Sequence, residues 1–297
     1  MLPRQILPGT TYLITRRCTQ RQFLLKPTPT TTDIFTYCLA VAAERCGILV
    51  HAVCVASNHY HAILTDPDAR LPEFLAYLNK YVAKAVNASL GRWENLWATE
   101  PPSCVRLLGP EDVLEKTRYV VCNPVAAGLV KRAKRWPGLL CFLPRHSLTV
   151  TRPTIFFRED GPLPATAQLR LTVAPALAAL GAAAVEERLS TMVRATEDRV
   201  TTELTAANRT FLGERGVLGQ RPSDTPRTRD PRRVLSPQVA GQSKWHRIEA
   251  LQRLKAFVVA YRAAWERWRT GVRRIVFPAG TYALRVHAGV SCEAAPA

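Results

Sequence analysis

The chain has 297 residues, 47% of them hydrophobic, which is enough for two domains or for one domain with a large extension. The 41 Lys and Arg residues outnumber the 23 Asp and Glu residues, and a net charge of +18 indicates a polyanionic partner, most often nucleic acid. No apolar run has the length of a membrane span and the N-terminus lacks a secretory signal, so we expect no membrane partner and a cytoplasmic protein.

The first 145 residues alternate between strand and helix patterns. β-Branched and aromatic residues predict a strand over residues 10–18, followed by a basic loop. Apolar residues at helical spacing, with a glycine after them, predict a helix over residues 31–47. The chain therefore begins with one strand and one covering helix.

Two further apolar runs, residues 48–56 and 59–66, are separated only by Ser57 and Asn58. This pattern predicts two antiparallel strands joined by a short turn. The following residues, 71–91, have an amphipathic pattern with a proline in the first turn, which predicts a second helix.

One more strand and one more helix complete this half of the chain. Residues 102–109 predict a strand, and residues 109–130 predict a helix that begins with acidic residues and is stopped by Pro124. The order β-α-β-β-α-β-α predicts an α+β fold in which helices cover an antiparallel sheet.

The composition changes near residue 147, so we divide the chain into a first domain, 1–147, and a basic, mainly helical C-terminal region, 148–297. The role of the second region is left open by its sequence. Its predicted elements are short strands or loops over 151–175, an alanine-rich helix over 176–208, a linker rich in Pro, Arg and Ser over 213–243, a basic helix over 244–274 and a closing hairpin over 274–292.

Two of the six histidines, His59 and His61, occupy alternate positions of one predicted strand. Residues i and i+2 of a strand point to the same face, so the two imidazoles can chelate one cation. Tyr60, between them, points into the opposite layer. The alternative is a pair of histidines on a half-exposed sheet face, and the short motif alone favours that alternative.

Tyr119 and Asn123 lie four residues apart on a predicted helix and therefore share a face. A tyrosine hydroxyl can act as a covalent nucleophile, and an asparagine carbonyl can ligate a hard cation. By itself Tyr119 fits helix packing better, but the histidine pair adds metal ligands to this nucleophile. No residue stands out as a general base, because Glu100 and Glu115 fit solvated carboxylates better.

Four segments together carry a resemblance to a known family. SNHYHAIL and YVVCNPVAAGLV, with GTTYLITRRCTQRQFLL and WENLWATE, resemble the HUH single-tyrosine transposases, in particular the REP-associated tyrosine transposases. The resemblance covers roughly residues 1–145. It implies that residues 1–147 form an HUH catalytic domain, a ferredoxin-like α/β sandwich.

The resemblance also implies a role for each matching residue. His59 and His61 match the pair that binds Mg²⁺ or Mn²⁺, Tyr119 matches the nucleophile, and Asn123 matches a third ligand. In this family the tyrosine attacks a phosphate of single-stranded DNA and leaves a 5′-phosphotyrosine link and a free 3′-OH. The implied partner is single-stranded or hairpin DNA from palindromic repeats, bound by a monomer or a homodimer.

Basic and aromatic residues around the predicted site are candidates for DNA contacts, because cations bind phosphates and indoles stack on bases. Core packing explains the tryptophans equally well. The basic helix over 244–274 either adds a DNA-binding face or packs on the first domain through its apolar stripe. The candidate DNA-binding residues are Arg16, Arg17, Arg21, Trp93 and Trp97.

The sequence therefore favours a metal-dependent enzyme that nicks and joins single-stranded or hairpin DNA. The alternative is a non-catalytic module that binds structured DNA or RNA on the same fold, and the intact set of two histidines, a tyrosine and an asparagine argues against it. A hydrolase of small phosphates ranks last, because it needs more carboxylate ligands than this set offers.

Overall fold

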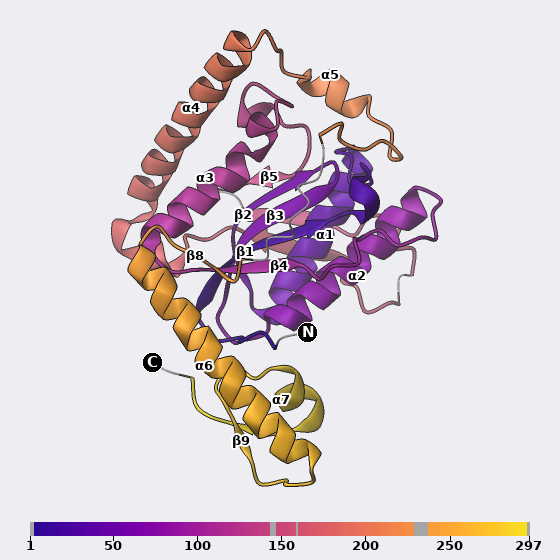
Figure 1. The fold of residues 1–297 in the computed structure, drawn as a ribbon. Coiled ribbons are helices and arrows are strands. Elements are labelled where there is room, and N and C mark those ends of the chain that lie inside the picture. The colour runs from indigo at the N-terminus through magenta and orange to yellow at the C-terminus, as the bar shows by residue number, and fades with distance from the viewer. Residues whose placement is uncertain (1–2, 143–146, 159, 229–236, 296–297) are drawn as a thin grey trace.

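The computed structural model describes residues 3–142, 147–158, 160–228 and 237–295 (Figure 1). Its centre is a six-stranded sheet with the strand order β5-β2-β3-β1-β4-β8, in which all neighbours are antiparallel except β4 and β8. The strands are β1 (Thr10–Arg17), β2 (Leu49–Ala56), β3 (His59–Asp66), β4 (Ser103–Leu107), β5 (Leu140–Cys141) and β8 (Val239–Ala240). The predicted α+β class and the predicted hairpin of β2 and β3 are confirmed.

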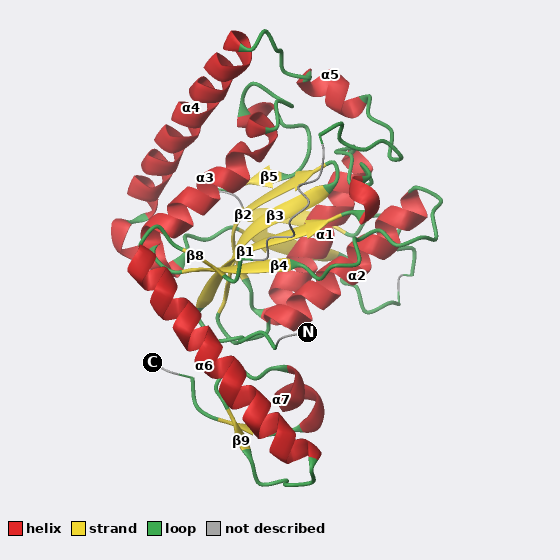
Figure 2. Ribbon diagram, in the orientation of Figure 1, coloured by secondary structure: helices red, strands yellow, loops and turns green. Residues whose placement is uncertain are grey.

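Helices cover both faces of this sheet (Figure 2). Helices α1 (Pro29–Cys46) and α2 (Leu71–Ser89) bury one face, and α3 (Pro110–Ala126) covers the other. Helix α1 starts where the Thr28 hydroxyl accepts a hydrogen bond from a first-turn amide, and ends at Gly47 with φ of +67°. These bounds agree with the two predicted helices to within about two residues.

Strand β3 shows how the two layers divide the side chains. Tyr60, Ala62 and Leu64 belong to the apolar cluster under α1 and α2, whereas Ile63 belongs to the cluster under α3. Because side chains alternate along a strand, His61 faces α3 together with Ile63. Tyr60 points into the opposite layer, as the sequence predicts.

Helix α3 does not stop at Pro124, so that prediction was wrong. Pro124 is buried inside the helix, which continues to Ala126. A proline removes the hydrogen bond of its own nitrogen and crowds the carbonyl four residues earlier, but the amide of Ala127 still donates to the Asn123 carbonyl (3.0 Å). The helix ends before Gly128, which adopts a φ of +70°.

The region after residue 147 packs against the sheet domain in several places. The hairpin of β6 (Ser147–Thr151) and β7 (Thr166–Arg170) lies on α1, and Leu169 joins the α1 and α2 core. A 3-10 turn, η3 (Pro175–Leu180), leads to α4 (Ala182–Ala206), which lies along α3. Short strands and an alanine-rich helix were predicted here, and both are observed.

Two predictions for the later part of the chain were wrong. The predicted linker over 213–243 contains α5 (Gly213–Leu218) and β8, although its residues 229–236 lie outside the described residues. The predicted closing hairpin is a parallel pair instead. Two-residue strands, β9 (Val276–Phe277) and β10 (Ser291–Cys292), are joined by a crossover that contains α7 (Ala283–Ala288).

Helix α6 (Lys244–Arg269) confirms the predicted basic helix and runs away from the sheet domain, with β9, β10 and α7 against its far half (Figure 1). No helix in the described part of the chain is both long and apolar enough to cross a membrane. The division of the chain at residue 147 stays a prediction.

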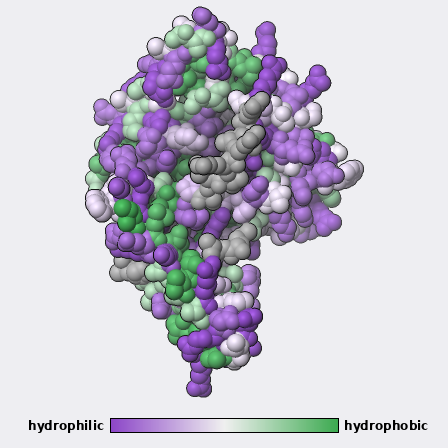
Figure 3. All heavy atoms as spheres, in the orientation of Figure 1, coloured by the Kyte–Doolittle hydropathy of each residue, from purple (hydrophilic) through white to green (hydrophobic). Residues whose placement is uncertain are grey.

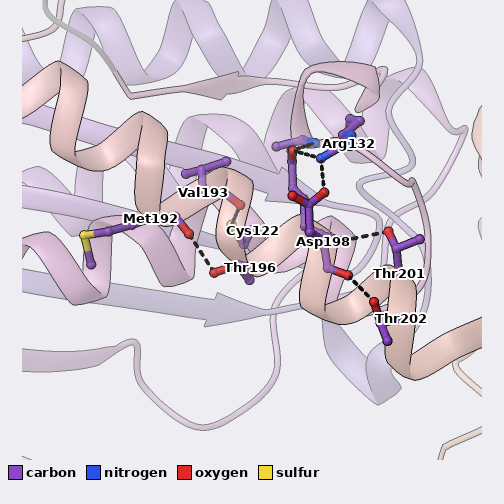
Figure 4. A network of polar contacts seen from close by, with 10 residues as sticks. Cys122, Arg132, Met192, Val193, Thr196, Asp198, Thr201 and Thr202 are labelled. Carbon is purple, nitrogen blue, oxygen red and sulfur yellow. Dashed lines mark hydrogen bonds and ion pairs between the residues drawn. The ribbon is translucent and has the colours of Figure 1, made fainter. Parts of the chain in front are cut away.

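Polar contacts hold α4 against α3 and the loop after it (Figure 4). Arg132, in that loop, donates to Glu197 (3.0 Å) and Asp198 (2.8 Å) of α4. Arg118 of α3 donates to the Thr196 hydroxyl (3.0 Å). Helix α3 is thus held between the sheet and a helix of the same chain.

A buried histidine, His51, joins the sheet to the segment after β7. It occupies an irregularity in the pairing of β2 with β3, between Val50 and Ala52. Its Nδ1–H donates to the Thr172 carbonyl (2.9 Å), so its Nε2 accepts a hydrogen bond from the Thr65 hydroxyl (2.8 Å). Burial lowers the pKa of His51 from 6.5 to about 4.

We expect His51 to make the fold sensitive to acid. An unfolded histidine binds its proton near pH 6.5 and folded His51 only near pH 4, so the free energy of unfolding decreases as the pH falls through this window. One such group contributes at most about 1.4 kcal/mol per pH unit. Urea unfolding of wild type and His51→Gln between pH 7 and 4 checks this. A His51→Gln curve parallel to the wild-type curve would contradict it.

Candidate active site

The two histidines of the HxH motif lie side by side at the start of β3. Their ring centroids are 4.7 Å apart and their planes are nearly perpendicular, at 77°. On the neighbouring strand β1, Thr15 pairs with His61 and Arg17 pairs with His59. The pairing of β1 with β3 therefore places a hydroxyl and a guanidinium on the same sheet face as the two imidazoles.

Each imidazole has its Nδ1 held by a neighbour. His59 Nδ1 lies 2.7 Å from the Asn58 side-chain oxygen, and His61 Nδ1 lies 2.7 Å from the Thr15 hydroxyl. The Asn58 amide nitrogen donates to the Arg21 carbonyl (3.1 Å), which fixes the orientation of the amide. Because an amide oxygen only accepts, His59 Nδ1 carries the proton and Nε2 keeps its lone pair, the form that a metal requires.

The tyrosine and asparagine of α3 complete the group. Tyr119 Oη lies 3.5 Å from Nε2 of His61, and their rings meet edge to face at 5.1 Å. The Asn123 side chain is hydrogen-bonded to both His59 and Tyr119. The Tyr119 side chain as a whole is 40% exposed, so part of it borders solvent. The structure thus brings together all four residues that the sequence singles out.

Burial dominates the ionisation of this group. It lowers the pKa of His59 from 6.5 to about 4, and it lowers the pKa of His61 well below 6.5. Both imidazoles are neutral at pH 7 and can act as ligands. Burial also raises the pKa of Tyr119 above 10, so its phenol is protonated at neutral pH and attacks only if a cation or base assists it.

The donor set fits a divalent cation that keeps open positions. The two imidazoles and the Asn123 amide lie together, and Nδ1 of each histidine is held by Asn58 or Thr15, as the partners of metal-binding histidines hold and orient the ring. Within the described residues no three or more His, Cys, Asp or Glu side chains gather as a metal cluster. The set therefore suits a cation whose remaining ligands are water and substrate phosphate.

The carboxylates considered as bases are engaged elsewhere or exposed. The Glu115 carboxylate is bound by Arg118, whose hydrogen bond lowers the pKa of Glu115 below 4.5. Glu100 is exposed and accepts a hydrogen bond from Arg16 through its backbone carbonyl. Among the described residues, neither carboxylate is a hydrogen-bond partner of Tyr119.

Sequence reasoning missed three residues of this site. Asn58 and Thr15 hold the histidines, and the Lys116 ammonium lies 5.9 Å from the Tyr119 ring centroid. Lys116 precedes Tyr119 by three residues, so helical spacing was a usable signal for it. Thr15 becomes visible only once the register of β1 against β3 is known.

The three candidate arginines occupy different positions. Arg17 is exposed on the site face beside His59, whose pKa its positive charge lowers further. Arg16 is on the opposite face, where it donates to the Glu100 carbonyl and stacks over Trp97 at 5.9 Å. Arg21 is near the turn and donates to the Thr228 carbonyl (2.6 Å). Only Arg17 shares a sheet face with the histidines.

The two candidate tryptophans also differ. Trp97 is half-buried, its indole N–H donates to the Asn79 carbonyl (2.9 Å), and it packs edge to face on Tyr60. Trp93 is 95% exposed in the same loop. That loop is attached to the segment after β1, where the Thr19 amide donates to the Leu96 carbonyl (2.9 Å). Trp97 supports the fold, whereas the whole Trp93 ring is available for a ligand.

Six chains of known structure are similar to parts of this chain, among them the two that follow. No family model and no curated protein matches the chain. A structure of a REP-associated tyrosine transposase bound to a REP hairpin is similar at 21% identity and a TM-score of 0.39, over 46% of this chain and 80% of that one. A putative transposase from Deinococcus radiodurans R1 is similar at 19% identity and a TM-score of 0.28, over 32% and 76%. Values this low assign no function to this chain.

Proposed function

We propose that the chain is a metal-dependent endonuclease and strand transferase that cleaves single-stranded DNA through a 5′-phosphotyrosine intermediate. The observation that carries this proposal is the 3.5 Å approach of Tyr119 Oη to Nε2 of His61, beside His59 and Asn123. A nucleophile then lies beside two imidazoles that are neutral at pH 7.

The reaction requires an attack on a DNA phosphate. Tyr119 loses its phenolic proton, its Oη forms a bond to phosphorus, and the bond from phosphorus to the 3′-oxygen breaks, with that oxygen taking up a proton. Attack of a 3′-OH on the phosphotyrosine reverses these changes and rejoins DNA without ATP. His59, His61 and Asn123 would hold a Mg²⁺ or Mn²⁺ ion, which would neutralise the phosphate oxygens as a Lewis acid.

Each residue of the site then has a defined task. Asn58 and Thr15 hold the imidazoles in their ligand orientation, Asn123 also orients the Tyr119 hydroxyl, and Arg17 attracts the DNA backbone. The net charge of +18 favours such a polyanionic substrate. The preference for hairpin or palindromic repeat DNA is taken from the sequence resemblance.

Covalent capture tests this function. The protein is incubated with a labelled hairpin that carries a single-stranded flank, with Mn²⁺, with Mg²⁺ or with EDTA, and is then denatured in detergent. We expect a labelled protein–DNA adduct that requires the cation. Hairpin binding without any adduct, over a panel of palindromic repeats, would favour the binding module instead.

We expect substitutions of the two tryptophans to have different effects, one on DNA binding and the other on stability. Trp93→Ala removes an exposed stacking surface and should weaken single-strand binding by about 1–3 kcal/mol with unchanged stability. Trp97→Ala should instead lower the free energy of unfolding, by at most about 3–5 kcal/mol. Fluorescence anisotropy and urea unfolding of both variants check this. Equal binding losses in two equally stable variants would contradict it.

A further inference from the structure

Helix α6 exposes one long face while its other face is covered by the same chain. Ala264 is buried where α6 meets the lobe formed by β9, β10 and α7, and Phe257 is buried beside Tyr261, which packs against the same lobe. On the outer side Leu251 and Val259 are 47% and 60% exposed. We call α6 together with this lobe the arm. Figure 3 shows hydrophilic and hydrophobic residues mixed along it. The outer face of α6 therefore has no cover in the described part of the chain.

The outer face carries a row of cations. Lys244, Lys255 and Arg262 are all exposed and follow one another at intervals of 11 and 7 residues, close to three turns and two turns of helix. They therefore lie in one line, which extends for about 27 Å at 1.5 Å per residue. Among the described residues none of the three has a hydrogen-bond or ion-pair partner.

The acidic residues of this segment do not neutralise that row. Residues 244–274 contain nine Lys or Arg and only two Glu. Glu249 is bound by Arg253 (2.7 Å) and Glu266 by Arg269. The positive charge of the outer face is thus not compensated by these glutamates. It suits a binding partner whose negative charges repeat along a line.

The base of the arm is fixed to the helix that carries Tyr119. Strand β8 pairs with β4, and the Gln242 amide donates to Asp112 in the first turn of α3 (2.7 Å). Asp112 and Tyr119 are seven residues apart, or about 10 Å along the helix. The start of α6 is therefore close enough to the candidate site for one DNA molecule to contact both.

We propose that the outer face of α6 binds the phosphate backbone of duplex DNA that continues from the strand at Tyr119. A row of about 27 Å matches about eight base pairs of B-DNA at 3.4 Å per step. The proposal builds on the proposed DNA substrate. It adds a second contact that holds the duplex part while the site holds the single strand.

Salt-dependent binding tests the arm without using cleavage. The full chain is titrated by fluorescence anisotropy into a plain 24-base-pair duplex and into a hairpin with and without a 12-base-pair extension. The test variant is Lys255→Gln with Arg262→Gln. The control is Arg253→Gln with Arg267→Gln, which removes the same charge from the opposite side of the helix. Circular dichroism verifies that both variants keep the helix.

We expect the test variant to lose about 2 units of the salt slope for duplex binding, near 0.9 for each lost phosphate contact, and the control to keep the wild-type slope. The extension should tighten hairpin binding in wild type but not in the test variant. Equal slopes in the two variants would overturn the proposal. So would a loss of dimer mass in sedimentation with Leu251→Ser and Val259→Ser, because the face would then join two copies. A normal slope difference without any covalent adduct would support the arm and contradict only the proposed cleavage.

Discussion

The Tyr119→Phe variant is expected to bind labelled hairpin DNA as wild type does and to form no covalent adduct with it. The substitution removes only Oη, the atom that lies 3.5 Å from Nε2 of His61. The ring keeps its contact with His61, so the shape of the site is retained. The adduct should fall to background because a phenyl ring has no nucleophilic oxygen.

The control for this experiment is Tyr81→Phe, which removes a phenol from α2 in the opposite layer, where Tyr81 stacks on Tyr77. This variant should form the adduct at the wild-type level. Loss of the Tyr119 hydrogen bonds should change the free energy of unfolding by about 0.5–1.5 kcal/mol, so a folding defect is not expected. A Tyr119→Phe protein that still forms the adduct would exclude Tyr119 as the nucleophile.

The layout of the site follows from two periodicities in the sequence. Alternation along β3 places His59 and His61 on one face, and the spacing of four residues in α3 places Tyr119 and Asn123 on one helix face. These two faces meet because α3 covers the sheet. The predicted α+β class, with helices on the sheet, implies such a covering. The four central residues were therefore accessible from the sequence.

The residues that support these four could not be predicted from the sequence, because their roles depend on tertiary contacts. Asn58 acts on His59 only because the Arg21 carbonyl fixes its amide, and a carbonyl position is invisible in a sequence. The same holds for the tryptophans, which share one loop although Trp97 is packed and Trp93 is exposed. Two residues of the same type in one loop can thus differ in role when only one of them packs against the core.

The errors of prediction also have physical reasons. The rule that a proline stops a helix considers one hydrogen bond, whereas the surrounding bonds and the buried packing of Pro124 carry α3 onward. Strand β8 has only two residues and is a strand only because its backbone pairs with β4. Elements this short have no periodicity that a sequence can display.

The His61→Ala variant is expected to lose both divalent cation binding and adduct formation. With one imidazole removed, only His59 and the Asn123 amide remain as protein ligands, too few to hold a hydrated cation firmly. Mn²⁺ titration by calorimetry or by electron paramagnetic resonance measures this without any DNA. The matched control is His51→Gln, which removes an imidazole from outside the site and should leave Mn²⁺ affinity unchanged.

Asn58→Ala should give an intermediate loss of Mn²⁺ affinity, which tests whether the Asn58 amide sets the tautomer of His59. Without the Asn58 oxygen, the proton of neutral His59 is free to move to Nε2, and ligation then requires a change of tautomer. Loss of such an orienting partner typically costs 10–100-fold in metal affinity, so we expect a loss of about that size. Wild-type affinity should change little between pH 7.5 and 6, because the pKa of His59 is about 4. An Asn58→Ala protein with wild-type Mn²⁺ affinity would show that the amide does not set the tautomer, and the histidines would then bind the cation without this support.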